Sequence, residues 1–389
     1  MTTGQVGGRG SVLGPAEVSD AELERIVAEW LGHPPDTVRL LRCVAEVVPY
    51  ELEAITTAGR YWVYGAVATP DGEQPFRFFV KHVRSFARSP RFAMVPPHLR
   101  EWAADTVPWR SEARVYASDL ADRLPPGLRM PRVAAIRELD EFSTAIWLEA
   151  VPAVPHTWTV ADLGRAAHSI GRLAARPAVQ ELNAIGGHPA SHPIRSYVDG
   201  RFMSQVRPML FDDAIWLHPL LTASFDGALI ERLRVAADAV PAYADELDAL
   251  PSAASHGDAS TNNLLVRADT DELTLIDFGF WTPKPLGFDI RQLLIGEVQL
   301  GRRPAADLPA IDAAVTAGYL AGVRDEGDAT DPQAIRRCHA LCLLLYSGLS
   351  LFPWEQLGDP SAITPEQVAA ARERAAATRF CLDLAEAAP

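Results

Sequence analysis

The sequence predicts an α+β fold in which a small, antiparallel β part precedes a larger, mainly helical part. Strand-like stretches rich in β-branched and aromatic residues crowd the first part of the chain. They lie at residues 44–54, 61–69, 76–83, 132–136 and 143–148. From about Pro152 onward helical patterns dominate, and only short strand-like pieces at 263–267 and 273–277 interrupt them.

The length of the chain supports a division into two lobes. A chain of 389 residues is too long for one ordinary hydrophobic core. We expect a flexible N-terminus at 1–18 and a small lobe at 19–150, with an inserted segment at 84–110. A helical lobe is expected at 151–389.

Local signals justify the first elements. Ser19 and Glu22 have the spacing of a capping box, and the helix that follows them is expected to end at Gly32. Residues 70–72, Pro-Asp-Gly, form a turn signal between two strands. Strands this closely spaced favour an antiparallel meander over a set of βαβ units.

The pattern changes at residues 84–110, where arginines among prolines are typical of an inserted surface segment. A helix resumes at about Ser111, and Thr364, Pro365 and Gln367 mark the start of a final alanine-rich helix. The basic residues of the inserted segment are Arg84, Arg88, Arg91 and Arg100.

Composition and charge narrow the class of function. Hydrophobic residues make up 48% of the chain and charged residues 22%, which are ordinary values for a globular protein. The net charge of −14 disfavours nucleic-acid binding, because neutralising phosphates needs a basic surface. The same charge would attract a cationic substrate.

Neither a membrane span nor a disulfide framework is expected. The longest apolar run, at 341–352, is too short to cross a bilayer, and the N-terminus lacks the apolar core of a signal peptide. We therefore place the protein in the cytoplasm. The four cysteines are scattered. Cys338 and Cys342 flank His339 one helical turn apart, but the leucines around them favour a buried helix face over a metal site.

The strongest chemical signal spans residues 256–279, where His-Gly-Asp-Ala-Ser-Thr-Asn-Asn is followed by a short strand pair and Ile-Asp-Phe-Gly. Asp258 supplies a carboxylate that can orient an acceptor hydroxyl and take its proton. Asn263, five residues later, and Asp277, after the next strand, supply the hard oxygen ligands that divalent cations prefer. Gly279 permits the bend by which the chain leaves the site. Together these spacings predict phosphoryl transfer.

On these motifs the chain resembles the aminoglycoside phosphotransferase and choline kinase branch of the protein-kinase-like superfamily. Gly257 stands where protein kinases carry arginine, and Ser260 stands where they carry lysine. The resemblance implies a two-lobed fold, ATP or GTP as donor, Mg²⁺, and an alcohol group of a small molecule as acceptor.

The resemblance also implies residues that bind the nucleotide. Lys81, at the end of a strand, corresponds to the lysine that holds the α- and β-phosphates, and Glu112 to its partner on a helix. The segment 55–61 would cover the phosphates through Thr57 and Gly59, although it lacks the G-x-G-x-x-G pattern of protein kinases. A simple hairpin turn remains the alternative there.

Three more positions follow from the resemblance. Glu149 and Val151 would meet the purine through their main chain at the hinge between the lobes. Asp289 would brace the catalytic loop.

Two other functions compete with that of a small-molecule kinase. A protein kinase is disfavoured because only residues 280–288 separate Gly279 from Asp289, which leaves no room for a peptide-docking segment. A catalytically silent or repurposed nucleotide-binding protein stays open because of the weak phosphate loop.

The sequence leaves the acceptor undetermined. An acidic, aromatic pocket in the helical lobe would suit a cationic substrate such as an aminoglycoside, which points to antibiotic resistance or natural-product chemistry. The basic insertion would instead suit an anionic substrate, and a neutral sugar or macrolide also fits. No oligomeric state is predicted. The candidate pocket residues are Asp199, Asp212, Asp213, Glu297 and Glu355, with Trp216, Trp281 and Trp354.

Overall fold

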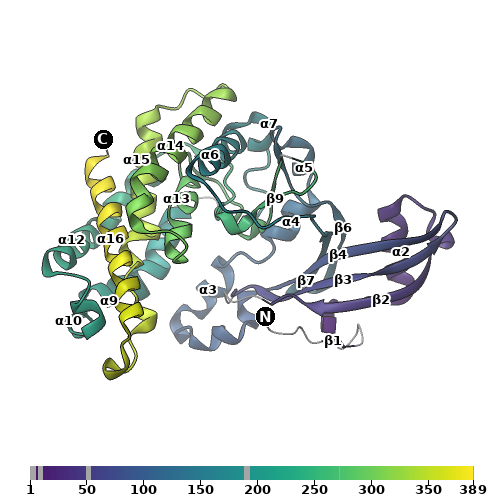
Figure 1. Ribbon diagram of the computed structural model, residues 1–389, viewed down its shortest axis with the longest axis horizontal. Helices are drawn as coiled ribbons and strands as arrows, with labels where there is room; N and C mark the ends of the chain where they lie inside the picture. The colour runs from purple at the N-terminus through teal and green to yellow at the C-terminus, as the bar shows by residue number, and fades with distance from the viewer. Residues whose placement is uncertain (1–5, 8–11, 50–53, 188–192, 271, 389) are drawn as a thin grey trace.

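The computed structural model describes residues 6–7, 12–49, 54–187, 193–270 and 272–388. An antiparallel sheet forms one end of the molecule, and a larger helical body forms the other (Figure 1). The predicted fold class is therefore confirmed.

Six strands form the sheet of the small lobe, in the order β1-β2-β3-β4-β7-β6, with every neighbouring pair antiparallel. Their alternating side chains divide between two hydrophobic cores. Phe78 and Val80 of β4 pack in a core with helix α2, while Val83 joins the core of the helical body. The strands are β1 (Val6–Gly7), β2 (Arg39–Val47), β3 (Thr57–Thr69), β4 (Gly72–Arg84), β6 (Val133–Asp140) and β7 (Ser143–Glu149).

The bounds of the first predicted strand are wrong. The strand expected at 44–54 is β2, which runs from Arg39 to Val47 and ends just before Val48 and Pro49. Its neighbour β3 begins at Thr57. The connection between the two strands therefore lies closer to the N-terminus than the predicted connection between residues 54 and 61. Residues 50–53 lie outside the described part of the chain.

Helix α2 (Asp20–Leu31) covers one face of the sheet (Figure 1). The Ser19 side chain accepts a hydrogen bond from the Glu22 main chain at 3.2 Å, and Gly32 ends the helix with a φ of 77°. Both predicted ends of this helix are confirmed. Leu13 and Val18 are buried in the same core, so residues 12–18 pack against the lobe.

The inserted segment folds as a series of short helices. It contains the 3₁₀ turns η3 (Phe86–Arg88), η4 (Pro90–Met94) and η5 (Pro97–Leu99), followed by helix α3 (Arg100–Thr106). Arg88 forms an ion pair with Asp140 at 2.5 Å, which fixes the start of the segment to the end of β6.

Helices make up most of the remaining chain, with short strand pairs between them. Within the described residues, no helix combines the length and apolar character needed to cross a bilayer.

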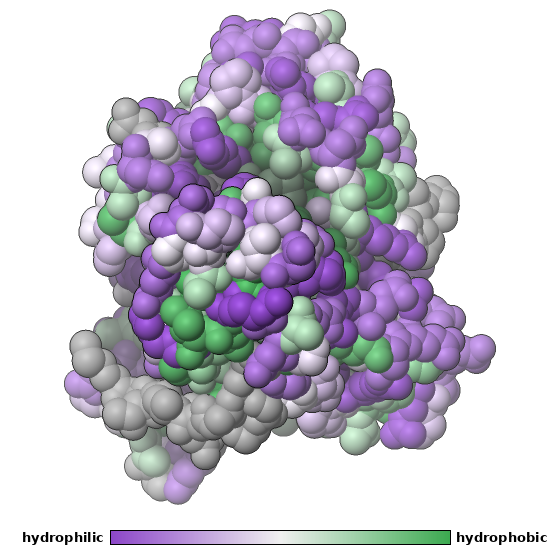
Figure 2. All heavy atoms as spheres, turned by 90° about the vertical axis from the view of Figure 1, so that its right-hand side faces the viewer, coloured by the Kyte–Doolittle hydropathy of each residue, from purple (hydrophilic) through white to green (hydrophobic). Residues whose placement is uncertain are grey.

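The face that carries the sheet is largely hydrophilic (Figure 2). The main elements are α4 (Ser111–Ala117), α5 (Leu120–Arg123), β5 (Leu128–Arg129), α6 (Val160–Ala175), α7 (Pro177–Gln180), α8 (Pro193–Tyr197), the π-helix η6 (Val198–Val206), α9 (Arg207–Phe211), α10 (Asp213–Trp216), α11 (Pro219–Thr222), α12 (Gly227–Asp248), β8 (Ser252–Ala253), β9 (Leu264–Val266), β10 (Leu273–Leu275), β11 (Lys284–Pro285), α13 (Ile290–Gln299), α14 (Leu308–Asp325), α15 (Pro332–Tyr346) and α16 (Pro365–Ala387).

The cysteines behave as predicted. Cys338 and Cys342 are fully buried on α15 with their sulfur atoms 3.9 Å apart, and neither is in a disulfide. They fill the helical core as small apolar side chains.

Helices α6 and α14 pack at very short range because glycines line their contact. A Cβ atom on Gly318 would lie 2.1 Å from the carbonyl oxygen of Gly164, and one on Gly322 would lie 2.1 Å from that of His168. Main-chain atoms cannot move aside as a side chain can, so this contact depends on glycine.

We expect Gly318→Ala to destabilise the protein by about 1–3 kcal/mol, because the added methyl group overpacks the contact. Gly227→Ala is the matched control: it lies at the start of α12, where a Cβ atom would have no other atom within 4 Å. Its greater helix propensity should leave stability unchanged or raise it by up to about 1 kcal/mol. Chemical denaturation of both variants measures this, and equal stabilities would contradict the close contact.

Candidate active site

The centre of the candidate site is the ammonium group of Lys81 on β4, which lies between helix α4 and the turn after β10. Its Nζ lies 2.6 Å from Oε2 of Glu112 on α4 and 2.9 Å from Oδ1 of Asp277. Lys81 and Glu112 are buried, whereas 43% of the Asp277 side chain is exposed. The structure thus joins three residues that lie far apart in the sequence.

Two carboxylates share this one ammonium, and the arrangement shifts the pKa values of all three groups. Burial alone would lower the pKa of Lys81, but Asp277 and Glu112 together raise it above its usual value. Burial raises the pKa of Glu112 to about 7, against the pull of Lys81. Desolvation would likewise raise the pKa of Asp277, but the Lys81 charge outweighs it and lowers that pKa. Lys81 therefore stays charged, and Asp277 stays ionised.

The loop that carries Asp258 depends on Gly257. This residue has a φ of 83°, and a Cβ atom there would lie 2.4 Å from the carbonyl oxygen of Phe280. Both observations require glycine. The His256 ring beneath the loop donates from Nε2 to the Ile276 carbonyl at 3.0 Å, because a carbonyl oxygen can only accept. Its Nδ1 then accepts from the Asp258 N–H at 3.3 Å.

Asn263 holds the Asp258 carboxylate in place. Its Nδ2 donates to Oδ2 of Asp258 at 3.0 Å and to the Asp258 carbonyl at 2.8 Å. Burial raises the pKa of Asp258 above its usual value, while the charge of Arg291 and the hydrogen bond from Asn263 oppose this shift. A desolvated carboxylate with a raised pKa is a better proton acceptor than an exposed one.

Asp277 has a left-handed backbone, with a φ of 64° and a ψ of 66°. It is the one non-glycine residue with positive φ in the part of the chain that the structure describes. Phe278 beside it is fully buried and packs edge to face against Tyr116 of α4 and against His256. This packing turns the Asp277 carboxylate toward Lys81 and maintains the strained conformation.

The first residues of the loop are held from the start of α13. Asp289 accepts from the main-chain N–H groups of His256 at 3.0 Å and of Gly257 at 2.9 Å, so its predicted bracing role is confirmed. Sequence reasoning missed Arg291, whose Nη2 donates to the Gly257 carbonyl at 2.9 Å. Arg291 follows Asp289 by two residues, and only the fold shows that its guanidinium group reaches the Gly257 carbonyl.

Glu297, a predicted pocket residue, supports the loop that carries Asp258. It is buried and accepts a hydrogen bond from the hydroxyl of Thr261 in that loop. Arg302 donates to the same carboxylate at 3.3 Å. Glu297 therefore braces the loop from α13.

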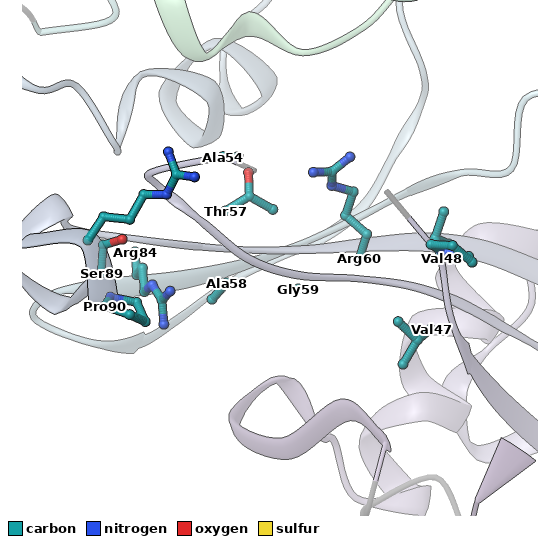
Figure 3. A pocket seen from close by; sticks show the side chains of 12 residues that line it. Val47, Val48, Ala54, Thr57, Ala58, Gly59, Arg60, Arg84, Ser89 and Pro90 are labelled. Atoms are coloured by element: carbon teal, nitrogen blue, oxygen red, sulfur yellow. The ribbon is translucent and has the colours of Figure 1, made fainter. Parts of the chain in front are cut away.

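The predicted phosphate loop has a different form from the one expected. Thr57 and Gly59 lie within strand β3, where Gly59 pairs with His82. A β-bulge between them interrupts the register. Both residues line a cavity at the end of the sheet, together with Arg60 (Figure 3).

The two hinge residues have part of their main chain engaged. The Glu149 N–H donates to the Arg132 carbonyl, and the Val151 carbonyl accepts from Ala153, both at 2.8 Å. Glu149 also pairs with Arg267 at 3.1 Å through its side chain.

Several of the acidic and aromatic residues of the helical lobe have partners within the protein. Asp213 pairs with Arg234 and Glu355 pairs with Arg374, each at 2.6 Å, and Asp212 caps α10. Trp281 is fully buried, and its indole donates to the Leu182 carbonyl at 3.0 Å. Most of these residues therefore serve structural roles.

Solved structures similar to this chain include three kinases and phosphotransferases. Amicoumacin kinase hAmiN in complex with AMP-PNP, Ca²⁺ and Ami is 13% identical, with 92% of this chain and 90% of that chain covered and a TM-score of 0.46. An aminoglycoside phosphotransferase from Alicyclobacillus acidocaldarius is 13% identical, with 87% and 92% covered and a TM-score of 0.47. Plasmodium vivax ethanolamine kinase is 12% identical, with 89% and 82% covered and a TM-score of 0.46.

The comparison by sequence is more decisive. No curated protein matches the chain. The sequence pattern of the phosphotransferase enzyme family, in contrast, matches residues 69–330, more than half of the chain, and this span includes Lys81, Glu112, Asp258 and Asp277. The protein therefore belongs to the phosphotransferase enzyme family.

Proposed function

We propose that the protein is a small-molecule kinase that transfers the γ-phosphoryl group of ATP or GTP to a hydroxyl group. The observation that carries this proposal is the arrangement around Lys81. One buried ammonium joins Glu112 and Asp277, while Asp258 and Asn263 are hydrogen-bonded to each other in the adjacent loop. In this proposal the lobe at 19–150 binds the nucleotide, and the lobe at 151–389 carries the catalytic loop and the acceptor site.

Asp258 is the proposed general base. Asn263 and the His256 ring fix the orientation of its carboxylate and main chain, so the carboxylate is positioned before an acceptor arrives. Its role is to accept a hydrogen bond from the acceptor hydroxyl and to take the proton during transfer.

Asn263 and Asp277 are the proposed metal ligands. Asn263 donates through Nδ2, which leaves its amide oxygen available, and Asp277 uses only Oδ1 for Lys81. The described residues contain no group of three or more His, Cys, Asp or Glu side chains suited to a metal, so protein ligands alone form no closed site. One carboxylate and one amide fit Mg²⁺, which keeps waters and binds through substrate phosphates. When bound, Mg²⁺ would neutralise charge on the transferring phosphoryl group.

Lys81 is proposed to hold the nucleotide phosphates. The ion pair with Glu112 fixes its position, and its raised pKa keeps it charged. Thr57 and the main chain near Gly59 would add hydrogen bonds to phosphate oxygens. At the hinge, the Val151 N–H and the Glu149 carbonyl would meet the purine edge.

We propose a small molecule with an alcohol group as acceptor, as the resemblance to aminoglycoside phosphotransferases and choline kinases implies. An aminoglycoside or another antibiotic or natural product fits this class, and the net charge of −14 would attract a cationic one. Action in the cytoplasm is part of the proposal.

The direct test incubates the protein with Mg-ATP or Mg-GTP and a panel of aminoglycosides, amines, sugars and nucleosides. Mass spectrometry then detects the added phosphoryl group. Nucleotide binding without any product across the panel would favour a nucleotide-binding protein that does not transfer phosphate.

Asp258→Asn should lower kcat by about 10²–10⁴-fold, because the amide cannot take the proton. Nucleotide affinity should stay close to that of the wild type. Asp71→Asn, in the exposed β3–β4 turn, removes the same charge far from the site and should leave kcat unchanged. Unchanged turnover in Asp258→Asn would overturn the assignment.

Asp277→Asn should abolish the dependence of nucleotide affinity on Mg²⁺. In the wild type, Mg²⁺ is expected to tighten nucleotide binding by about tenfold or more, equivalent to about 1.4 kcal/mol. Titration calorimetry with and without Mg²⁺ measures both proteins. If the variant shows the same tightening as the wild type, Asp277 is not a metal ligand.

The raised pKa of Asp258 predicts a pH profile. A base acts in its ionised form, so kcat/KM should fall as the pH drops through the raised pKa, above the value of about 3.9 of an ordinary aspartate. Nucleotide affinity and circular dichroism at each pH separate this effect from phosphate titration and unfolding. A kcat/KM that stays flat down to a pH of about 3.9, the pKa of an ordinary aspartate, would contradict the prediction.

A further inference from the structure

A second cavity, of about 340 Å³, lies among the helices α14, α15 and α16. Helices α15 and α16 belong to the part of the helical body that lies away from the sheet (Figure 1). A cavity of this volume is within the range of small-molecule sites. Among the described residues that line it, none comes from the loop that carries Asp258 or from α13, which braces that loop. The cavity is therefore separate from the candidate active site.

One side of this cavity carries a carboxylate group that the protein holds in place. His339 of α15 is buried, and its Nε2 donates to Oδ1 of Asp312 on α14 at 2.9 Å, because a carboxylate oxygen can only accept. The Thr316 hydroxyl donates to the same oxygen at 3.4 Å. The other oxygen, Oδ2, is open to solvent, and none of the described residues forms a hydrogen bond with it. Oδ2 is therefore available to a ligand.

Arg336 of α15 adds the opposite charge to the same cavity. Its side chain is exposed, and within the described chain no carboxylate or carbonyl group pairs with it. Its neighbour Arg337, in contrast, pairs with Glu246 at 2.7 Å and donates to the carbonyl groups of Ala385 and Ala388. Arg337 thereby attaches the end of α16, which forms one wall of the cavity, to α15.

The two charges in the cavity do not neutralise each other. Asp312 and Arg336 form no ion pair in the part of the chain that the structure describes, although both line the cavity. The rest of the wall is apolar and includes Leu384, Ala313 and Ala317. A ligand that carries one ammonium and one carboxylate group would bind both side chains at once, and the apolar wall would exclude water from part of this contact.

We propose that this cavity binds a free α-amino acid with an apolar side chain. Asp312 accepts hydrogen bonds from the ammonium group of the ligand, and Arg336 binds its carboxylate. The planar fork of arginine suits a carboxylate, because it donates two parallel hydrogen bonds. Leu384 and the alanines of the wall contact the apolar side chain of the ligand. The protein thus has a second ligand site, beyond those of the proposed kinase reaction.

The first measurement is thermal unfolding of the full-length protein with each standard amino acid at millimolar concentration, because a ligand of the native state raises Tm. Apolar amino acids should raise Tm, and L-leucine serves as the reference probe. Titration calorimetry should give the same affinity for L-leucine with and without saturating Mg-AMP-PNP. Loss of L-leucine binding in the presence of Mg-AMP-PNP would assign the ligand to the active site and overturn the proposal.

Modified probes and variants then assign each charge of the ligand to one residue. L-leucinamide lacks the carboxylate and N-acetyl-L-leucine lacks the ammonium group, so each should bind about tenfold or more weakly than L-leucine. Arg336→Gln should weaken L-leucine binding by about tenfold or more and leave the affinity for L-leucinamide unchanged. Asp312→Asn should weaken L-leucine binding to a similar extent and leave the affinity for N-acetyl-L-leucine unchanged.

Arg324→Gln is the matched control, because it removes an exposed arginine of α14 that does not line the cavity. It should bind L-leucine like the wild type. Asp312→Asn changes a partner of the buried His339, whereas Arg336→Gln changes only an exposed side chain and tests the site without disturbing the core. Equal affinity for L-leucine in Arg336→Gln and the wild type would overturn the proposal, as would an unchanged Tm with every standard amino acid. These experiments measure no phosphoryl transfer, so their outcome is independent of the proposed kinase function.

Discussion

The site depends on one buried cation. Lys81 connects the sheet through β4, the helix α4 through Glu112, and the turn after β10 through Asp277. Burying an ion costs several kcal/mol unless it is paired, so each of these three segments must be in place before the ammonium is compensated. The ammonium keeps Asp277 ionised, whereas burial raises the pKa of Glu112 to about 7.

A second network, independent of the first, determines where Asp258 lies. Asp289 and Arg291 bind main-chain groups of the same loop. The Asp289 carboxylate accepts hydrogen bonds from the N–H groups of His256 and Gly257. The Arg291 guanidinium donates to the Gly257 carbonyl. Both begin helix α13, so the loop is attached to a rigid element. Gly257 makes this possible, because its positive φ turns both main-chain groups toward α13.

The sequence alone could predict that residues a short distance apart in the chain share a site. It could not predict contacts between residues that only the fold brings together. Asp258, Asn263 and Asp277 lie on one hairpin, so their spacing alone indicated a common site. Lys81 and Glu112 could be assigned to the same site only through the resemblance to a family. The strand position of Thr57 and Gly59 depends on pairing with β4 and on a β-bulge, which no local pattern shows. The acidic residues of the helical lobe form ion pairs that the sequence does not show, because their arginine partners lie many positions away, as with Glu355 and Arg374.

The register of one hairpin determines which side chains of β4 lie on the same face as Glu112 and Asp277. The side chains of a strand alternate, so β4 turns Lys81 toward Glu112 of α4 and Arg84 toward the opposite face of the sheet. A slip of one residue would exchange these faces and separate Lys81 from Glu112. The β3–β4 turn opposes this slip: Thr69 pairs with Gly72, and its hydroxyl donates to the Gly72 carbonyl at 2.9 Å. A turn at the far end of the sheet thereby determines which cation of β4 lies beside Glu112 and which lies on the opposite face.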